Sequence, residues 1–287
     1  MCDDDIHVGL IVDPTVSRRT FGLMGLAAAA GAAGSAAAAT PTVEKDVEVK
    51  TADGTCDAAL LYPQGKGKWP AVILWTDVAG LRGAFREMGR RLAGEGYVVL
   101  VPNAYYRVKR APVIDATFDF NKPEDRAKLA ALRPSITPDG TARDAAACVA
   151  FLDAQPQTNK KRKIGTQGYC MGGALAFRTA AAVPGRVGAV GSFHGGGLFT
   201  DKLDSPHLLI PTTHAEYLVL IAGNDHQQDP TIEGKLKTAF AEAKRTAKVE
   251  VYETAKHGWC VPGSAVYDQP AAEKAWAELR ALYKRAL

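Results

Sequence analysis

The sequence is poor in cysteine and has no C-x-x-C pair. Its five cysteines are spread along 287 residues, at positions 2, 56, 148, 170 and 260. Neither the cysteines nor the six histidines form a cluster with the ligand spacing of a zinc site, so no metal is expected. A chain of this length can bury a core without a disulfide framework, and free thiols are therefore expected.

Long runs of one charge are also missing. Charged residues make up 23% of the chain, the formal net charge is +4, and no block of Lys and Arg is dense enough to follow a nucleic-acid backbone. A nucleic-acid-binding function is therefore not expected. The chain is 47% hydrophobic and has no internal repeat or long low-complexity linker, which is typical of a globular protein.

The first forty residues have the features of an export signal in the right order. Arg18 and Arg19 stand before residues 22–39, which are almost entirely Ala and Gly. A twin arginine before a weakly apolar run is typical of a twin-arginine signal peptide, which predicts contact with that export machinery and a periplasmic location. Removal of residues 1–40 would leave one domain at 41–287. A flexible or helical tail and a retained membrane anchor are the alternatives.

After this segment, apolar runs alternate with helical patterns. Strands are expected at 47–50, 58–62, 71–75, 97–101, 163–169, 187–193, 217–222 and 249–252. Helices are expected at 85–94, 125–132, 142–154, 172–182, 232–245 and 271–287. This alternation predicts an α/β fold with a mostly parallel central sheet and helices on both faces. The irregular stretch 107–141 is interpreted as an excursion that borders the active site.

One cysteine stands at a glycine-rich turn. The segment Gly168-Tyr169-Cys170-Met171-Gly172-Gly173 follows an expected strand and opens an expected helix, which is the context in which G-x-S-x-G forms a nucleophile elbow. The helix N-terminus offers backbone N–H groups and partial positive charge, which favour a thiolate and an oxyanion. Cys170 is therefore the candidate nucleophile. The alternative is a turn with a buried structural cysteine.

Two later residues suit the roles of acid and base. Asp225 ends the apolar run around 217–222, and His257 follows the run 249–252 by a short loop. In folds with a nucleophile elbow, the acid and the base follow in chain order at the ends of later strands. His257 is predicted to take the Cys170 proton, and Asp225 to orient it. Taken singly, Asp225 could cap a helix and His257 could lie on a surface loop.

The ten residues from Gly168 to Phe177 resemble the nucleophile segment of dienelactone hydrolases, and the similarity extends from about Val43 to the C-terminus. The resemblance implies an α/β-hydrolase fold and cleavage of a carboxylic ester or lactone through a covalent acyl-enzyme, as in carboxymethylenebutenolidases. It implies no cofactor. A small-molecule substrate is the expected ligand, and no stable protein partner is predicted.

The resemblance also implies roles in the loop after the third strand. In the family a carboxylate there contacts the nucleophile, and the next N–H helps to form the oxyanion hole. The matching residues are Asp77 and Val78, with the N–H of Met171 as the second donor. The family usually has Glu in place of Asp77, so the shorter side chain puts the contact with Cys170 in doubt. A loop-turn role is the alternative for Asp77.

Family members bind a substrate carboxylate with two arginines. The first matches Arg107, but the second position, four residues after the candidate base, holds Val261. Neutral esters or lactones are therefore expected to be accepted more readily than by an ordinary member. Tyr106, Trp259 and His194 are candidates for the pocket lining, with packing as the alternative.

Other readings of the same elbow remain open. A non-hydrolytic thiol redox sensor and a ligand-binding pseudo-enzyme are the alternatives to an esterase. Cys260 lies three residues after His257, so it could approach Cys170 and close a disulfide in an oxidising compartment.

Overall fold

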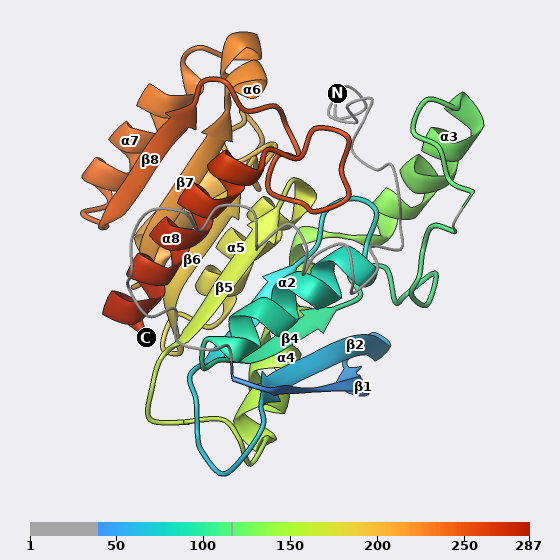
Figure 1. Ribbon diagram of the computed structural model, residues 1–287. Helices are drawn as coiled ribbons and strands as arrows, with labels where there is room; N and C mark the ends of the chain where they lie inside the picture. Colours follow the sequence, from blue (N-terminus) through green and yellow to red (C-terminus); the bar gives the residue numbers. More distant parts are fainter. Residues whose placement is uncertain (1–39, 116) are drawn as a thin grey trace, which may run out of the picture.

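The computed structural model describes residues 40–115 and 117–287, which form one eight-stranded sheet with helices packed on it (Figure 1). The strands are β1 (Thr42–Thr51), β2 (Gly54–Pro63), β3 (Ala71–Trp75), β4 (Val98–Pro102), β5 (Ile164–Tyr169), β6 (Val187–Phe193), β7 (Glu216–Ala222) and β8 (Ala247–Tyr252). Their order is β1-β2-β4-β3-β5-β6-β7-β8. The predicted export signal lies outside the described residues, except for its last residue.

The sheet is mostly parallel, as the alternating pattern predicted. β2 pairs antiparallel with both β1 and β4, and all the other neighbours are parallel. β3, β4 and β5 are buried along their whole length. Burial of both faces explains why β3 and β4 read as continuous apolar runs rather than as an alternating pattern.

Two layers of helices cover the sheet. The helices α2 (Gly83–Gly94) and α8 (Gln269–Ala286) pack on one face. The helices α4 (Pro138–Ala154), α5 (Met171–Ala182) and α7 (Ile232–Glu242) pack on the other. Among the described residues, no helix is long and apolar enough to cross a bilayer.

Local capping sets where two of these helices begin. The hydroxyl of Thr137 accepts the N–H of Gly140 at 3.0 Å, and Pro138 occupies the first helical turn of α4. Asp268 accepts the N–H of Ala271 at 3.1 Å in the same way before α8. A side-chain acceptor at this position satisfies an N–H that has no partner within the helix. Both helices therefore start earlier than the apolar periodicity predicted.

The excursion after β4 contains α3 (Pro123–Leu132) and the 3-10 helix η1 (Arg133–Ser135). It packs through a small third cluster, separate from the two main ones, whose members are Val78, Ala79, Tyr105, Val113, Ile114, Phe120 and Leu129. Two of these members, Val78 and Ala79, belong to the loop after β3. The excursion is therefore joined to the edge of the sheet where the parallel strands end, which is where sites in α/β folds are usually built.

Candidate active site

The nucleophile candidate stands at a strained turn. Cys170 directly follows β5 and precedes α5, with φ 53° and ψ −119°. A Cβ added at Gly168 would lie 1.9 Å from the carbonyl oxygen of Gly172, and one added at Gly172 would lie 2.5 Å from that of Thr76. No residue except glycine fits at either position. These close approaches bring the start of α5 against the end of β3 and hold Cys170 in the left-handed region.

The structure brings His257 and Asp225 together at the ends of β8 and β7. Asp225 lies in the short helix α6 (Gly223–Gln228), and its Oδ2 is 2.7 Å from Nδ1 of His257. Asn224 holds the base through a second contact, because its Oδ1 accepts the backbone N–H of His257 at 2.7 Å. The charge of Cys170 acts on the same imidazole, so the structure brings the three predicted residues into one group.

The charge state of His257 follows from these neighbours. Burial acts to lower the pKa of His257, whereas the negative charge of Cys170 and the hydrogen bond that Asp225 accepts from the imidazole act to raise it. The raising causes dominate, and the pKa of His257 lies well above the ordinary value for histidine. The site therefore favours the imidazolium form of His257 beside the candidate nucleophile.

Val78 and Met171 carry the two backbone N–H groups that are the predicted donors to an oxyanion. Val78 lies in the loop after β3, and Met171 is the first residue of α5. Within the described part of the chain, neither N–H is bonded to another backbone carbonyl. The hydroxyl of Tyr105 donates to the carbonyl of Val78 at 2.9 Å and contacts Sδ of Met171 at 3.5 Å, so it joins the two sides. Tyr105 was not identified from the sequence, although it follows β4 at the same edge of the sheet.

Asp77 does not contact the nucleophile in the way the family resemblance implied. Its carboxylate forms two hydrogen bonds with the guanidinium of Arg82, at 2.6 and 2.8 Å, and accepts the N–H of Ala79 at 3.0 Å. The side chains of Asp77 and Arg82 are 1% and 3% exposed. The carboxylate is used within its own loop, which supports the loop-turn alternative. Arg82 was missed because nothing in the sequence pairs it with Asp77.

Arg107 and Tyr106 are also engaged elsewhere. The guanidinium of Arg107 donates to both oxygens of Asp144 at 2.8 Å and to Asp53 at 2.6 Å. The hydroxyl of Tyr106 is bonded to Asp144 at 2.8 Å and to Thr51 at 2.7 Å. These contacts tie the β1–β2 hairpin to α4 and neutralise the guanidinium with carboxylates of the protein. They do not support the substrate-binding roles expected from the sequence.

The aromatic candidates pack within the protein. Trp259 is 0% exposed and stacks on Tyr252 with ring centroids 5.3 Å apart. His194 is also 0% exposed and meets Trp259 edge-on at 5.1 Å. Val261, at the position of the missing arginine, is 0% exposed. These contacts support the packing alternative for Trp259 and His194.

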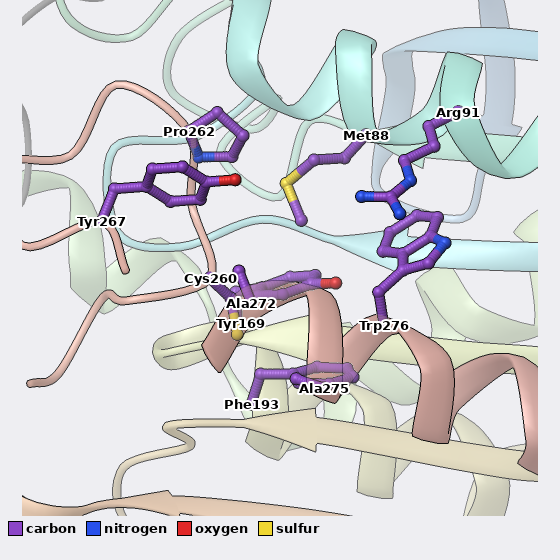
Figure 2. Close-up of a pocket in the computed structure, with 10 residues that line it drawn as sticks. All are labelled: Met88, Arg91, Tyr169, Phe193, Cys260, Pro262, Tyr267, Ala272, Ala275 and Trp276. Atoms are coloured by element: carbon purple, nitrogen blue, oxygen red, sulfur yellow. The ribbon is translucent and has the colours of Figure 1, made fainter. Parts of the chain in front are cut away.

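The side chain of Cys260 faces the helical layer formed by α2 and α8. Its side chain borders a cavity of about 20 Å³, enough for one water, together with Met88, Tyr169 and Trp276 (Figure 2). Burial raises the pKa of the Cys260 thiol well above its ordinary value. The four cysteines that the structure describes are all free thiols, so the bridge between Cys260 and Cys170 is not formed. In residues 40–115 and 117–287, no group of three or more His, Cys, Asp or Glu is placed to hold a metal.

Comparison with known proteins agrees with this geometry. The pattern of the Dienelactone hydrolase family matches residues 56–287. A carboxymethylenebutenolidase of Pseudomonas putida is 27% identical over 229 residues, covering 79% of this chain and 90% of that protein. Another, from Pseudomonas sp. strain P51, is 36% identical over 129 residues, covering 45% of this chain and 51% of that protein.

Solved structures share the fold. A Klebsiella pneumoniae protein provisionally assigned as a dienelactone hydrolase superposes with a TM-score of 0.73 at 21% identity, covering 85% of this chain and 99% of that one. A dienelactone hydrolase of Anabaena variabilis gives 0.58 at 17% identity, covering 86% and 99%. These similarities confirm the predicted α/β-hydrolase fold. Together with the matched family pattern, they show that the chain is a hydrolase that belongs to the dienelactone hydrolase family.

Proposed function

We propose that this chain hydrolyses carboxylic esters or lactones through a covalent thioester on Cys170. The observation that carries the proposal is the pairing of Asp225 with His257 at 2.7 Å, on an imidazole that the charge of Cys170 also reaches. The three residues stand at the C-terminal ends of β7, β8 and β5. Three strands of one sheet therefore hold the nucleophile, base and acid in a constant arrangement.

In the first half of the reaction, Nε2 of His257 holds the proton that comes from the thiol, and Sγ of Cys170 attacks the carbonyl carbon. The carbonyl π electrons move to oxygen, and the N–H groups of Val78 and Met171 donate to the resulting oxyanion. The intermediate then collapses, the bond to the leaving oxygen breaks, and His257 returns its proton to that oxygen. An ester releases its alcohol, whereas a lactone opens and keeps the new hydroxyl on the acyl chain.

In the second half, a water molecule attacks the thioester and gives its proton to His257. The oxyanion forms in the same place, and its collapse expels Sγ of Cys170, which recovers the proton, and releases the carboxylic acid. Asp225 accepts the Nδ1–H throughout, which fixes the tautomer of the base and stabilises the imidazolium in both halves.

The loop after β3 that carries Val78 is called the oxyanion loop below. Its surroundings favour an uncharged acyl group. Four partly buried apolar side chains pack against the third cluster: Phe118, Leu132, Ile136 and Met171. The position of the second family arginine holds a buried Val261, and Arg107 is neutralised by two carboxylates. Apolar contact replaces ion pairing on this side of the site, so neutral esters or lactones are the proposed substrates.

Turnover of a chromogenic acetate and of simple lactones tests the activity. We expect wild type to turn over, and Cys170→Ala to fold but lose several orders of magnitude in kcat, because the covalent step is removed. Cys260→Ala is the matched control, since it also removes a buried thiol. Cys170→Ala activity above about a tenth of wild type would rule out the nucleophile. A redox sensor or a pseudo-enzyme would show no turnover in any variant.

The substrate preference is tested by kcat/KM for a carboxylated lactone and a neutral lactone of similar size. Wild type should not prefer the carboxylated compound. Arg133, in η1, is the cation to examine in parallel, because its charge acts on the phenol of Tyr105 beside the oxyanion loop. A strong preference for the carboxylated lactone that disappears in Arg133→Ala would show that the acyl side is anionic and would overturn the proposed preference.

A further inference from the structure

The imidazole of His194 touches the backbone of the nucleophile. His194 is the first residue after β6, and its Nδ1 accepts the N–H of Cys170 at 3.1 Å. The backbone N–H of His194 donates to the carbonyl of Leu220 in β7 at 2.8 Å. His194 has φ 41° and its side chain is completely buried, so β6 and β7 hold the ring in place.

The same ring packs on the base. The ring centroids of His194 and His257 are 4.8 Å apart, and that of Tyr169 is 6.0 Å from His194. One side chain therefore contacts both the nucleophile's backbone and the base that serves it. Because the His194 side chain is fully buried, its contacts with Cys170 and His257 are the ones by which it can influence the reacting groups.

The tautomer of His194 follows from its contacts. Burial and the neighbouring His257 keep the pKa of His194 well below its ordinary value, although the charge of Asp225 acts in the opposite direction. The ring is therefore neutral, with one donor and one acceptor. Because Nδ1 accepts from Cys170, the proton must sit on Nε2. Among the described residues, Nε2 of His194 has no hydrogen-bond partner. The ring is therefore placed for the hydrogen bond at Nδ1.

The strain at the elbow explains why this acceptor matters. A cysteine with φ 53° is in a region that non-glycine residues rarely occupy, and it stays there only when its surroundings hold it. The N–H of Cys170 is shared between the carbonyl of Phe193, at 3.0 Å, and Nδ1 of His194. Loss of one acceptor would let the turn relax and move Sγ relative to His257.

We propose that His194 is a positioning residue, which sets the geometry between the thiol of Cys170 and the ring of His257 through its acceptor nitrogen. This inference rests on the proposed function, in which His257 takes the Cys170 proton. A displacement of about 1 Å at a reacting centre can slow a reaction about a hundredfold. The role therefore predicts an effect on kcat and thiol reactivity rather than on KM.

Two complementary variants separate the contribution of the acceptor nitrogen of His194 from that of its ring. His194→Asn keeps an acceptor close to the position of Nδ1 but loses the ring, whereas His194→Phe keeps a ring and loses the acceptor. We expect His194→Phe to lower kcat about tenfold to a hundredfold with little change in KM. His194→Asn should recover most of that loss. His207→Phe is the matched control, because His207 lies in the 3-10 helix η2 (Pro206–Thr212), stacks on Phe199 and has contacts that do not involve Cys170.

The pH dependence of Cys170 alkylation by iodoacetamide is measured on the same variants. It reports the thiol and its base without requiring any ester to be turned over, so it separates failure of this inference from failure of the proposed function. The alkylation midpoint should shift to higher pH in His194→Phe and stay near wild type in His194→Asn. Equal losses in both variants would mean simple packing and would overturn the inference, as would unchanged behaviour of His194→Phe.

Wild-type protein provides a test that does not depend on the folding of any variant. Nitrogen NMR of labelled histidine should show His194 protonated at Nε2 alone over the whole pH range of activity. A His194 ring that carries its proton on Nδ1, or that becomes doubly protonated within that range, could not accept from Cys170. Either result would overturn the inference.

Discussion

The buried pair of Asp77 and Arg82 provides the sharpest test of how the oxyanion loop is held. The two side chains are linked by hydrogen bonds of 2.6 and 2.8 Å and are almost fully buried. Arg82 also donates to the carbonyl of Gly80 at 3.2 Å and lies 4.9 Å from the ring of Phe85. The pair thus closes the loop that carries Val78.

Removing one partner leaves the other charge buried without compensation. For a pair of this kind the loss in the free energy of unfolding is about 3–5 kcal/mol. We expect Asp77→Asn to show a loss of that size, because the amide cannot neutralise Arg82. The double variant Asp77→Asn, Arg82→Met should recover most of the loss, since replacing both members of a buried pair is often close to neutral.

Urea denaturation of wild type, the two single variants and the double variant gives the coupling energy of the pair. Ester turnover on the same four proteins should fall in the single variants and partly recover in the double variant, because Val78 moves with the loop. The reasoning fails if the free energy of unfolding of Asp77→Asn stays within about 1 kcal/mol of the wild-type value while its kcat falls sharply. That combination would mean that Asp77 acts on the nucleophile after all.

Three further outcomes follow from the described contacts and the sequence. Arg107→Ala should lower the free energy of unfolding, measured by urea denaturation, by about 1–3 kcal/mol, because hydrogen bonds to charged groups are lost. The same variant should leave the ratio of kcat/KM for carboxylated and neutral lactones unchanged. Because the negative charge of Cys170 raises the pKa of His257, Cys170→Ala should let the imidazolium lose its proton at lower pH, which NMR titration measures; an equal midpoint would contradict this. We propose that the chain is exported, so lysine at both Arg18 and Arg19 should leave precursor in the cytoplasm, and unchanged cell fractionation would refute it.

The nucleophile segment could be predicted because its signals are local. An elbow needs glycine at fixed offsets around one residue, and the acid and base then follow at the ends of later strands. These rules place Cys170, Asp225 and His257 without any knowledge of tertiary contacts. Val78 and Met171 are assigned instead through the resemblance to the dienelactone hydrolases.

The ion pairs could not be predicted in the same way. Arg107 lies 54 residues from Asp53 and 37 from Asp144, and only the folded sheet places the three together. Strand lengths in the first hairpin were underestimated for a related reason. The ladder from Thr42 to Pro63 continues through polar positions, since its backbone hydrogen bonds depend on the turn rather than on apolar side chains.

The phenol of Tyr105 has a consequence for how this site can diversify. It bonds the carbonyl of Val78 and reaches the side chain of Met171, so the distance between the two proposed oxyanion donors depends on a residue from the loop after β4. The loop that sets the distance between these two N–H groups is therefore different from the residues that carry out the reaction. Variation in one loop can retune the enzyme to acyl groups of a different size while the nucleophile, the base and the sheet stay unaltered.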